Sequence, residues 1–362
     1  MLKLAAPTLP IVLSVLTLAC TSTNETESAA VRSHPPTAHA SDPARRIHWE
    51  AWSDDVFERA HREKRFVVLD LEAIWCHWCH VMEETTYSDP RVIDLVGEHY
   101  IAVKVDQDSR PDLSNRYEDY GWPATIVFDA DGGEIIKRSG YIPPLEFAAT
   151  LQAIVDDPTP GPSVERKRDV VYASSSSIDG ELRDALERSL AADYDPKLGG
   201  FGFTHKYLDA PSVEYCMVLG AEGDAERENM ARRTLDEQLQ LIDPAWGGAY
   251  QYSAGGVWTE PHFEKIMAIQ ADDLRTYSRA YALYRDPRYS KAAQDIHRYL
   301  REFLTSRDGA FYTSQDADLV QGEHSGEYFA LSDAERRKQG MPRIDEHVYS
   351  RENGWAARAR DT

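Results

Sequence analysis

One stretch of this chain, "VVLDLEAIWCHWCHVMEE" at residues 67–84, constrains the fold more than any other. Its apolar start predicts a buried strand, and the residues after the first cysteine predict a helix. Cys76 and Cys79 therefore lie where a strand leads into a helix, with His77 between them and His80 directly after them. Such a cluster can be a redox dithiol, a c-type haem attachment site, a zinc site or a purely structural pair.

The segments on either side of this motif predict alternating helices and strands. From apolar spacing and turn residues we expect a helix in 49–65, a strand at 66–71, a helix from 76, a helix at 90–100, a strand at 101–106, a hairpin around "DADGG" in 124–141, and a helix at 144–157. The first folded unit should therefore span residues 49–157.

This order of elements resembles the thioredoxin fold. The residues that carry the resemblance are Trp75 directly before the first cysteine, Asp70 in the preceding strand, and Pro123 within "GWPATIVF". The resemblance implies that Asp70 is a buried carboxylate able to exchange a proton during the reaction. It also implies that Pro123 is a cis-proline facing the dithiol, where it leaves a backbone edge open for a substrate strand.

The position of each cysteine predicts its role. Cys76 lies at a helix N-terminus, where unpaired N–H groups and the helix dipole favour the thiolate, and a protonated His77 would favour it further. We expect the Cys76 sulfur to be the more exposed one and to attack first, and Cys79, one turn deeper, to resolve the mixed disulfide. The sequence does not decide whether the pair reduces or oxidises its substrates.

The competing interpretations fit the context of the motif less well. "CHWCH" is also C-x-x-C-H, the haem attachment pattern, and its cysteines and histidines could bind zinc. A buried strand before the motif and a hairpin after it leave little room for a haem. A purely structural dithiol is hard to maintain in a compartment that oxidises thiols. We therefore expect a redox-active disulfide and neither haem nor a metal ion.

The N-terminus predicts export. Residues 1–19 combine one lysine with a short apolar run and read as a signal peptide. A small residue before Cys20 resembles a bacterial lipoprotein signal, which would make Cys20 a lipidated residue and residues 20–48 a flexible tether. Thr21 in the next position resembles sorting to the periplasmic side of an outer membrane in a Gram-negative cell. The alternative, cleavage after Ala40, lies far beyond the apolar run.

Charge restricts the partners. The chain has 61 acidic and 40 basic residues and a formal net charge of -21, which would repel phosphate backbones, so we expect no nucleic-acid partner. The expected partners are protein disulfide substrates, a thiol or disulfide redox partner, and a membrane reached through the lipid anchor.

The second half of the chain predicts helices. A Pro-rich linker at 158–178 is followed by amphipathic helical patterns in 179–362. Three Gly-aromatic loops, "LGGFGF", "WGGAYQYS" and "DGAFYTSQDAD", recur about fifty to sixty residues apart, which is typical of helical arrays. Cys216, on one of these helices, is expected to be a small core residue.

Several motifs taken together resemble the spermatogenesis-associated protein 20 family: "WCHWCHVMEE", "GGFG", "PHFEK", "GAFYTSQDAD" and "ENGW". The resemblance implies an α/β thioredoxin-like domain followed by an all-α (α/α)6 toroid, a fold also found in glycosidases and sugar epimerases. Only about three helical hairpins are visible, so we expect a partial, truncated toroid that exposes apolar faces.

The toroid suggests a second class of function, a carbohydrate-binding or carbohydrate-modifying protein in which the thioredoxin-like domain is regulatory or structural. In that case His262 and Glu264 could act as acid and base, and aromatic side chains could stack on sugar rings. These residue types also commonly cap helices and pack loops, and His205 and Lys206 are weaker candidates. The candidate binding residues are Tyr252, Trp258, His262, Glu264, Asp316 and Asp318.

Overall fold

A computed structural model describes residues 46–164 and 177–360 of the chain. All of these residues belong to one compact unit, Asp42–Thr362. The predicted signal peptide, the lipidation site Cys20, most of the tether and the centre of the linker lie outside the described residues.

A five-stranded sheet organises the first half of the described chain. Its strands are β1 (Trp49–Glu50), β2 (Phe66–Glu72), β3 (Tyr100–Asp106), β4 (Ala124–Phe128) and β5 (Glu134–Ser139). The strand order is β1-β3-β2-β4-β5, with β1, β3 and β2 parallel and β4 and β5 added antiparallel. Five consecutive residues of β2 are buried, because helices cover the sheet on both faces.

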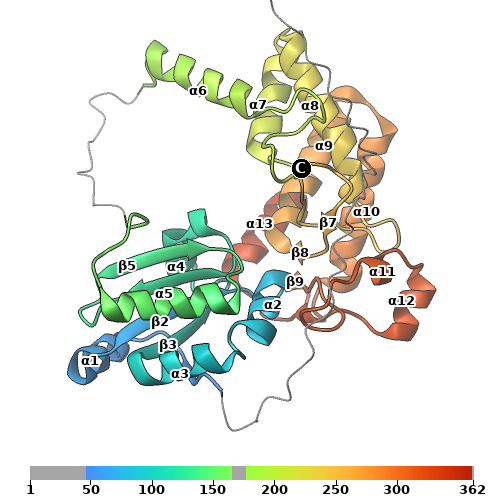
Figure 1. Cartoon of the computed structure of the whole chain (residues 1–362). Helices are drawn as coiled ribbons and strands as arrows, with labels where there is room; N and C mark the ends of the chain where they lie inside the picture. Colours follow the sequence, from blue (N-terminus) through green and yellow to red (C-terminus); the bar gives the residue numbers. More distant parts are fainter. Residues whose placement is uncertain (1–45, 165–176, 361–362) are drawn as a thin grey trace, which may run out of the picture. The chain divides into compact units, whose positions relative to one another are not determined.

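Helices lie on both faces of the sheet (Figure 1), and a layer of hydrophobic side chains on each face holds them against it. On one face α1 (Asp54–Glu63) and α4 (Pro111–Arg116) pack against inward side chains of β2, β3 and β4. On the other face α2 (His77–Thr85), α3 (Pro90–His99) and α5 (Pro144–Asp156) pack against the alternate residues of the same strands. The predicted thioredoxin-like fold class is confirmed by this layered arrangement.

The prediction for residues 49–65 was wrong at its start. Trp49 and Glu50 form strand β1, which pairs with Ala102 and Val103 of β3, and the helix begins only at Asp54. Two residues are too few to show a period in the sequence, so β1 is determined by the edge of β3 and not by local preference. Helix α4 and the short 3₁₀ helix η1 (Glu118–Tyr120) were also not predicted.

The second half of the described chain is mostly helical. Its longer helices are α6 (Gly180–Asp193), α7 (Ala210–Ala221), α8 (Ala225–Gln238), α9 (Met267–Tyr284), α10 (Pro287–Phe303) and α13 (Ser350–Arg360). Helix α7 packs against α8, and α9 packs against both α10 and α13. One large hydrophobic core contains side chains from α7, α8, α9, α10 and α13, as expected for a toroid-like array of helix pairs. Short elements connect them: η2 (Leu239–Leu241), α11 (Gly326–Phe329), α12 (Asp333–Gln339), β6 (Tyr252–Ser253), β7 (Pro261–His262), β8 (Lys265–Ile266), β9 (Ser314–Gln315) and β10 (Ile344–Asp345).

The three Gly-aromatic loops share a structural feature. Each is closed by an isolated antiparallel bridge: Tyr194 with Phe201, Ile242 with Ala249, and Thr305 with Phe311. Two of the loops also contain a buried ion pair, in which Lys206 Nζ lies 2.8 Å from Asp195 and Lys265 Nζ lies 2.6 Å from Asp243. Lys206, a weak candidate site residue, therefore has a structural partner.

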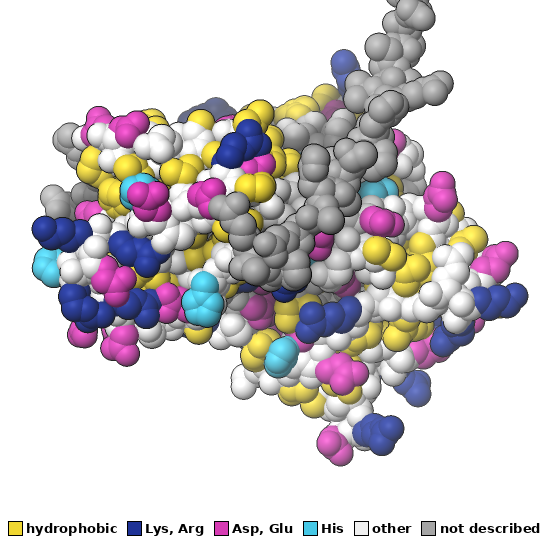
Figure 2. Space-filling view, turned by 60° about the horizontal axis from the view of Figure 1, so that its bottom comes forward, with side chains coloured by type: hydrophobic (Ala, Val, Ile, Leu, Met, Phe, Trp, Pro, Cys, Tyr) yellow, Lys and Arg dark blue, Asp and Glu magenta, His cyan; other side chains and the backbone are white. Residues whose placement is uncertain are grey.

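Apolar side chains are exposed along α6, α7 and α9. Helix α6 has no buried residue, and Leu186 on it is 54% exposed, beside Tyr215 and Val218 of α7. Among the described helices, none is both long enough and apolar enough to cross a membrane. On the face shown in Figure 2, acidic and basic side chains are interspersed.

Candidate active site

The two cysteines of the motif are joined as a disulfide at the start of α2. Cys76 is the N-cap of the helix, and its Sγ lies 2.16 Å from the Sγ of Cys79. The Cys79 amide also donates a hydrogen bond to the Cys76 sulfur, with N and Sγ 3.1 Å apart. The strand-to-helix junction thus places the pair at the positive end of the helix dipole, as the sequence predicted.

Aromatic side chains enclose the disulfide on the thioredoxin-like side. Trp75 and Trp122 meet edge to face with ring centres 5.7 Å apart, and Trp122 packs against the cluster that contains the two cysteines. The indole of Trp75 donates to Asp108, 2.9 Å away. The bond between Trp122 and Pro123 is cis, as the thioredoxin resemblance implied.

The disulfide is not open to solvent. Cys76 and Cys79 are each only 3% exposed, so the expectation that Cys76 is the more exposed of the two is not met in this structure. The cover comes from the helical half of the chain. Ile266 packs against the cysteine cluster, and the Ala317 amide donates to the Trp75 carbonyl at 3.4 Å. Trp78, between the cysteines, remains 39% exposed.

Carboxylates from the helical half also contact the histidines of α2. His77 Nδ1 lies 2.7 Å from one oxygen of Asp318, and His80 Nδ1 lies 3.0 Å from the other. His80 Nδ1 is 3.7 Å from Asp316, and the amide of His77 donates to Glu264 Oε1 at 3.3 Å. Three residues that the sequence suggested as sugar ligands are therefore brought to the dithiol helix.

The pairing of β8 with β9 explains why these carboxylates point the same way. Lys265 pairs with Gln315, so continuing the register by one residue places Glu264 opposite Asp316. Asp318 follows two residues later and lies on the same face, because side chains alternate along extended chain. Lys265 and Gln315 point away from α2, toward Asp243 and Tyr299 respectively.

The histidines and carboxylates in this cluster shift one another's pKa values. Burial alone would lower the pKa of His80, but its hydrogen bond to Asp318 and the charges of both aspartates raise the pKa overall. Burial raises the pKa of Asp316 to about 6, against the opposing effect of His80. Burial would likewise raise the pKa of Asp318, but its hydrogen bonds with His77 and His80 lower it below the usual value.

Trp258 and Tyr252, the aromatic residues suggested as sugar ligands, are both packed against other side chains. Trp258 is buried in the helical core, where its indole donates to the Leu198 carbonyl at 3.0 Å and packs over Gly200. Tyr252 stacks on His262 with ring centres 4.3 Å apart, and His262 lies 6.2 Å from the His77 ring. The predicted set is thus divided between the core and the neighbourhood of the dithiol.

Asp70 is buried in β2, as the thioredoxin resemblance implied, and is 1% exposed. Burial, together with the charge of Glu72, raises its pKa to about 7, although the Lys104 ammonium 3.6 Å away acts in the opposite direction. Asp70 Oδ1 has no hydrogen-bond partner in the described part of the chain. A carboxyl group in this state can hold or release a proton near neutral pH.

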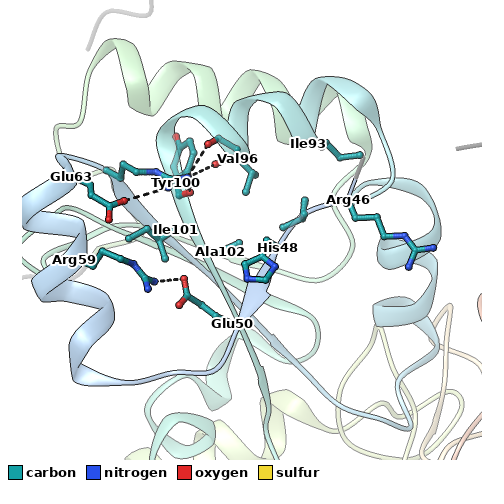
Figure 3. Close-up of a pocket in the computed structure, with 13 residues that line it drawn as sticks. Arg46, His48, Glu50, Arg59, Glu63, Ile93, Val96, Tyr100, Ile101 and Ala102 are labelled. Carbon is teal, nitrogen blue, oxygen red and sulfur yellow. Dashed lines mark hydrogen bonds and ion pairs between the residues drawn. The ribbon is translucent and has the colours of Figure 1, made fainter. Parts of the chain in front are cut away.

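A separate cavity of about 440 Å³ lies at the β1 edge of the sheet (Figure 3). Two of its arginines are already engaged: Arg59 pairs with Glu50, and Arg65 donates to the carbonyls of Val96 and Tyr100. The cavity is lined by α1, α3, β1 and β3, and none of its lining residues belongs to the dithiol cluster.

Comparison with known proteins agrees with this description. The family model Thioredox_DsbH, described as "Protein of unknown function, DUF255", matches residues 31–156. Human spermatogenesis-associated protein 20 is 27% identical over 315 residues, which are 77% of this chain and 40% of that protein. The chain thus spans about two fifths of the length of the first curated relatives it matches.

Smaller matches concern the thioredoxin-like half. The thiol:disulfide interchange protein DsbD of Ralstonia nicotianae is 34% identical over 103 residues, 27% of this chain and 17% of that protein. A solved structure titled "DsbH Oxidoreductase" is 17% identical, and the match covers 38% of this chain and 96% of that one at a TM-score of 0.27. The fold, the similarity to DsbD and the Cys76–Cys79 disulfide together support a redox-type function.

Proposed function

Because this chain is a relative of spermatogenesis-associated protein 20 that carries a thioredoxin-like domain, we propose that it is a thiol–disulfide oxidoreductase. The observation that carries the proposal is the Cys76–Cys79 disulfide at the N-terminus of α2, packed beside the cis bond before Pro123. A disulfide in this position can exchange with a second dithiol while the sheet keeps its geometry fixed.

The exchange proceeds through a mixed disulfide. In the reducing direction the Cys76 thiolate attacks a substrate disulfide, forms a new S–S bond, and releases one substrate thiolate, which takes a proton. The Cys79 thiolate then attacks Cys76, which releases the second substrate thiolate and restores the Cys76–Cys79 disulfide. The substrate gains two electrons and two protons, and the dithiol loses them. The oxidising direction is the reverse.

Groups near the start of α2 have opposing effects on the stability of a thiolate there, and a separate carboxylate is placed to accept a proton. The N-terminus of α2 stabilises a negative charge on Cys76. Glu264 occupies the His77 amide, which is one of the donors at that end of the helix, and its own charge disfavours a nearby thiolate. Asp70, with a pKa of about 7, is the proposed proton acceptor for Cys79.

Access to the disulfide is part of the proposal. With both cysteines 3% exposed, a protein substrate must first displace the cover formed by Ile266 and Ala317. Opening there breaks the long hydrogen bond from Ala317 to the Trp75 carbonyl and the contacts of Asp318 with His77 and His80. We therefore expect opening of this segment to limit the rate with large substrates more than with small ones.

A turnover assay on the full chain tests the proposal. The protein should accelerate the reduction of insulin disulfides by dithiothreitol, and Cys76→Ser should reduce the acceleration to background. Cys216→Ala is the matched control, because Cys216 is a free, fully buried cysteine on α7, and it should keep the wild-type rate. Equal rates for wild type and Cys76→Ser would refute the oxidoreductase function.

Export and lipid anchoring complete the proposal. They are supported by the signal-like residues 1–19 and by Cys20 after a small residue. Cys20→Ser should release the protein from membranes into the soluble fraction. Retention on membranes with the signal segment uncleaved would contradict lipidation at Cys20.

Carbohydrate binding, the alternative considered above, stays a prediction without a supporting contact. Glu264, Asp316 and Asp318 face α2, and Trp258 is part of the core. No observation on the described residues favours a sugar site over the redox site.

A further inference from the structure

Three buried carboxylates gather beside the dithiol, and three buried histidines, His77, His80 and His262, lie next to them. Glu264, Asp316 and Asp318 share one strand face, and His77 and His80, three residues apart, share the facing side of α2. Each of the five side chains is buried. In the described part of the chain these carboxylates form ion pairs only with histidines. Like charges in opposite positions of a strand pair are destabilising, so a cation bound between these carboxylates would stabilise the arrangement.

His80 is oriented as a metal ligand would be. Its Nε2 lies 3.1 Å from the Ile74 carbonyl, the kind of partner to which a metal-ligating histidine donates its other N–H. With Nε2 turned to that carbonyl, the His80 Nδ1 atom faces Asp318, 3.0 Å away, and Asp316, 3.7 Å away.

The spacing of the three ligand atoms fits an ion. One atom each from His80, Asp316 and Asp318 lie within 4.8 Å of one another. Neighbouring ligands around an ion with bonds of about 2.1 Å lie about 3.0 to 3.4 Å apart, close to the two distances from His80. The second oxygen of Asp318 is held by His77, as a ligating carboxylate commonly is by its outer neighbour.

An independent observation points to the same place. Glu264 is 3% exposed, and its Oε2 has no hydrogen-bond partner in the described structure. The register of β8 and β9 places this glutamate opposite Asp316, on the face turned toward α2. A buried carboxylate oxygen without a donor is costly, and a bound cation would satisfy it.

We propose that His80, Asp316 and Asp318 bind a divalent transition-metal ion, with Glu264 as an adjacent acceptor. One imidazole with carboxylate oxygens suits Mn²⁺, Fe²⁺ or Zn²⁺ better than soft thiolate-seeking ions. This site differs from zinc on the cysteines, and it departs from the expectation above that no metal is needed. Because His80 belongs to α2 and the aspartates to the segment after β9, the ion would fasten the cover over the disulfide.

The test uses the full chain with its disulfide intact, so that the sulfurs of Cys76 and Cys79 cannot bind the added metal as thiolates. Protein freed of metal with EDTA is titrated with Mn²⁺ and, separately, with Zn²⁺ by calorimetry. We expect one ion per chain, and a loss of affinity of tenfold or more in Asp316→Asn. Asp273→Asn is the matched control, because Asp273 is a buried carboxylate on α9 that accepts from Gln238 and lies outside the cluster.

Two further measurements keep the proposal testable if Asp316→Asn does not fold. Pulsed electron paramagnetic resonance of the wild-type protein with Mn²⁺ should show coupling to one histidine nitrogen. Reduction of the disulfide by dithiothreitol should be several-fold slower with Mn²⁺ than with EDTA. Absence of stoichiometric binding, binding that Asp316→Asn leaves unchanged, or bound Mn²⁺ without nitrogen coupling would each overturn the proposal.

Discussion

Replacing Asp70 by asparagine should stabilise the protein at alkaline pH. The pKa of Asp70 is raised from 3.8 to about 7, so the folded state binds this proton more tightly than the unfolded state does. Ionised Asp70 therefore destabilises the folded state, and the free energy of unfolding falls as pH rises from about 4 to about 7. The difference between 3.8 and about 7, at about 1.36 kcal/mol per pH unit, gives a cost of about 4 kcal/mol above pH 8.

The pH dependence separates this effect from a change in packing. The amide in the Asp70→Asn variant cannot ionise, so the advantage of the variant should reach about 4 kcal/mol at pH 8.5 and decline to about 2 kcal/mol at pH 5, where native Asp70 keeps its proton. These values already include the attraction of Lys104, which acts to lower the pKa of Asp70. Urea unfolding of both proteins at both pH values measures the difference. A variant that is less stable at pH 8.5, or equally changed at both pH values, would refute the reasoning.

Three other substitutions or reactions test separate parts of the structure. Asp243→Asn should destabilise the protein by about 3 to 5 kcal/mol in urea unfolding, because it leaves Lys265 and Arg336 buried without their carboxylate; a change below about 1 kcal/mol would contradict this. Asp318→Asn should speed dithiothreitol reduction of the disulfide several-fold by loosening the cover, and an unchanged rate would count against that contact. Cys216, whose pKa burial raises to about 11, should react with iodoacetamide only on unfolding, and rapid labelling of native protein would show the core is open.

The thioredoxin-like half could be predicted because its signals are local. A run of apolar residues before the cysteines predicts β2, and the turn "DADGG" predicts the β4–β5 hairpin. Strand β1 could not be predicted, because two residues carry no period and their partner, β3, lies about fifty residues away in sequence.

The candidate site was predicted only in part. Cys76 and Cys79 follow from their spacing and from the strand-to-helix junction. Glu264, Asp316 and Asp318 were singled out as polar groups beside aromatic loops, yet their contacts with α2 join positions more than 180 residues apart. The alternation of Asp316 and Asp318 indicates a shared face in extended chain. Nothing in the sequence shows which helix that face meets, or that it buries the disulfide.

The most direct test of the central claim is to trap the mixed disulfide. Cys76 caps the helix and Cys79 lies one turn deeper, so Cys76 should form the bond to substrate and Cys79 should break it. The account predicts that Cys79→Ser accumulates a covalent complex with a disulfide substrate, that mass spectrometry locates the bond at Cys76, and that Cys76→Ser accumulates none. A complex bonded through Cys79 in Cys76→Ser, or no complex in either variant, would contradict it.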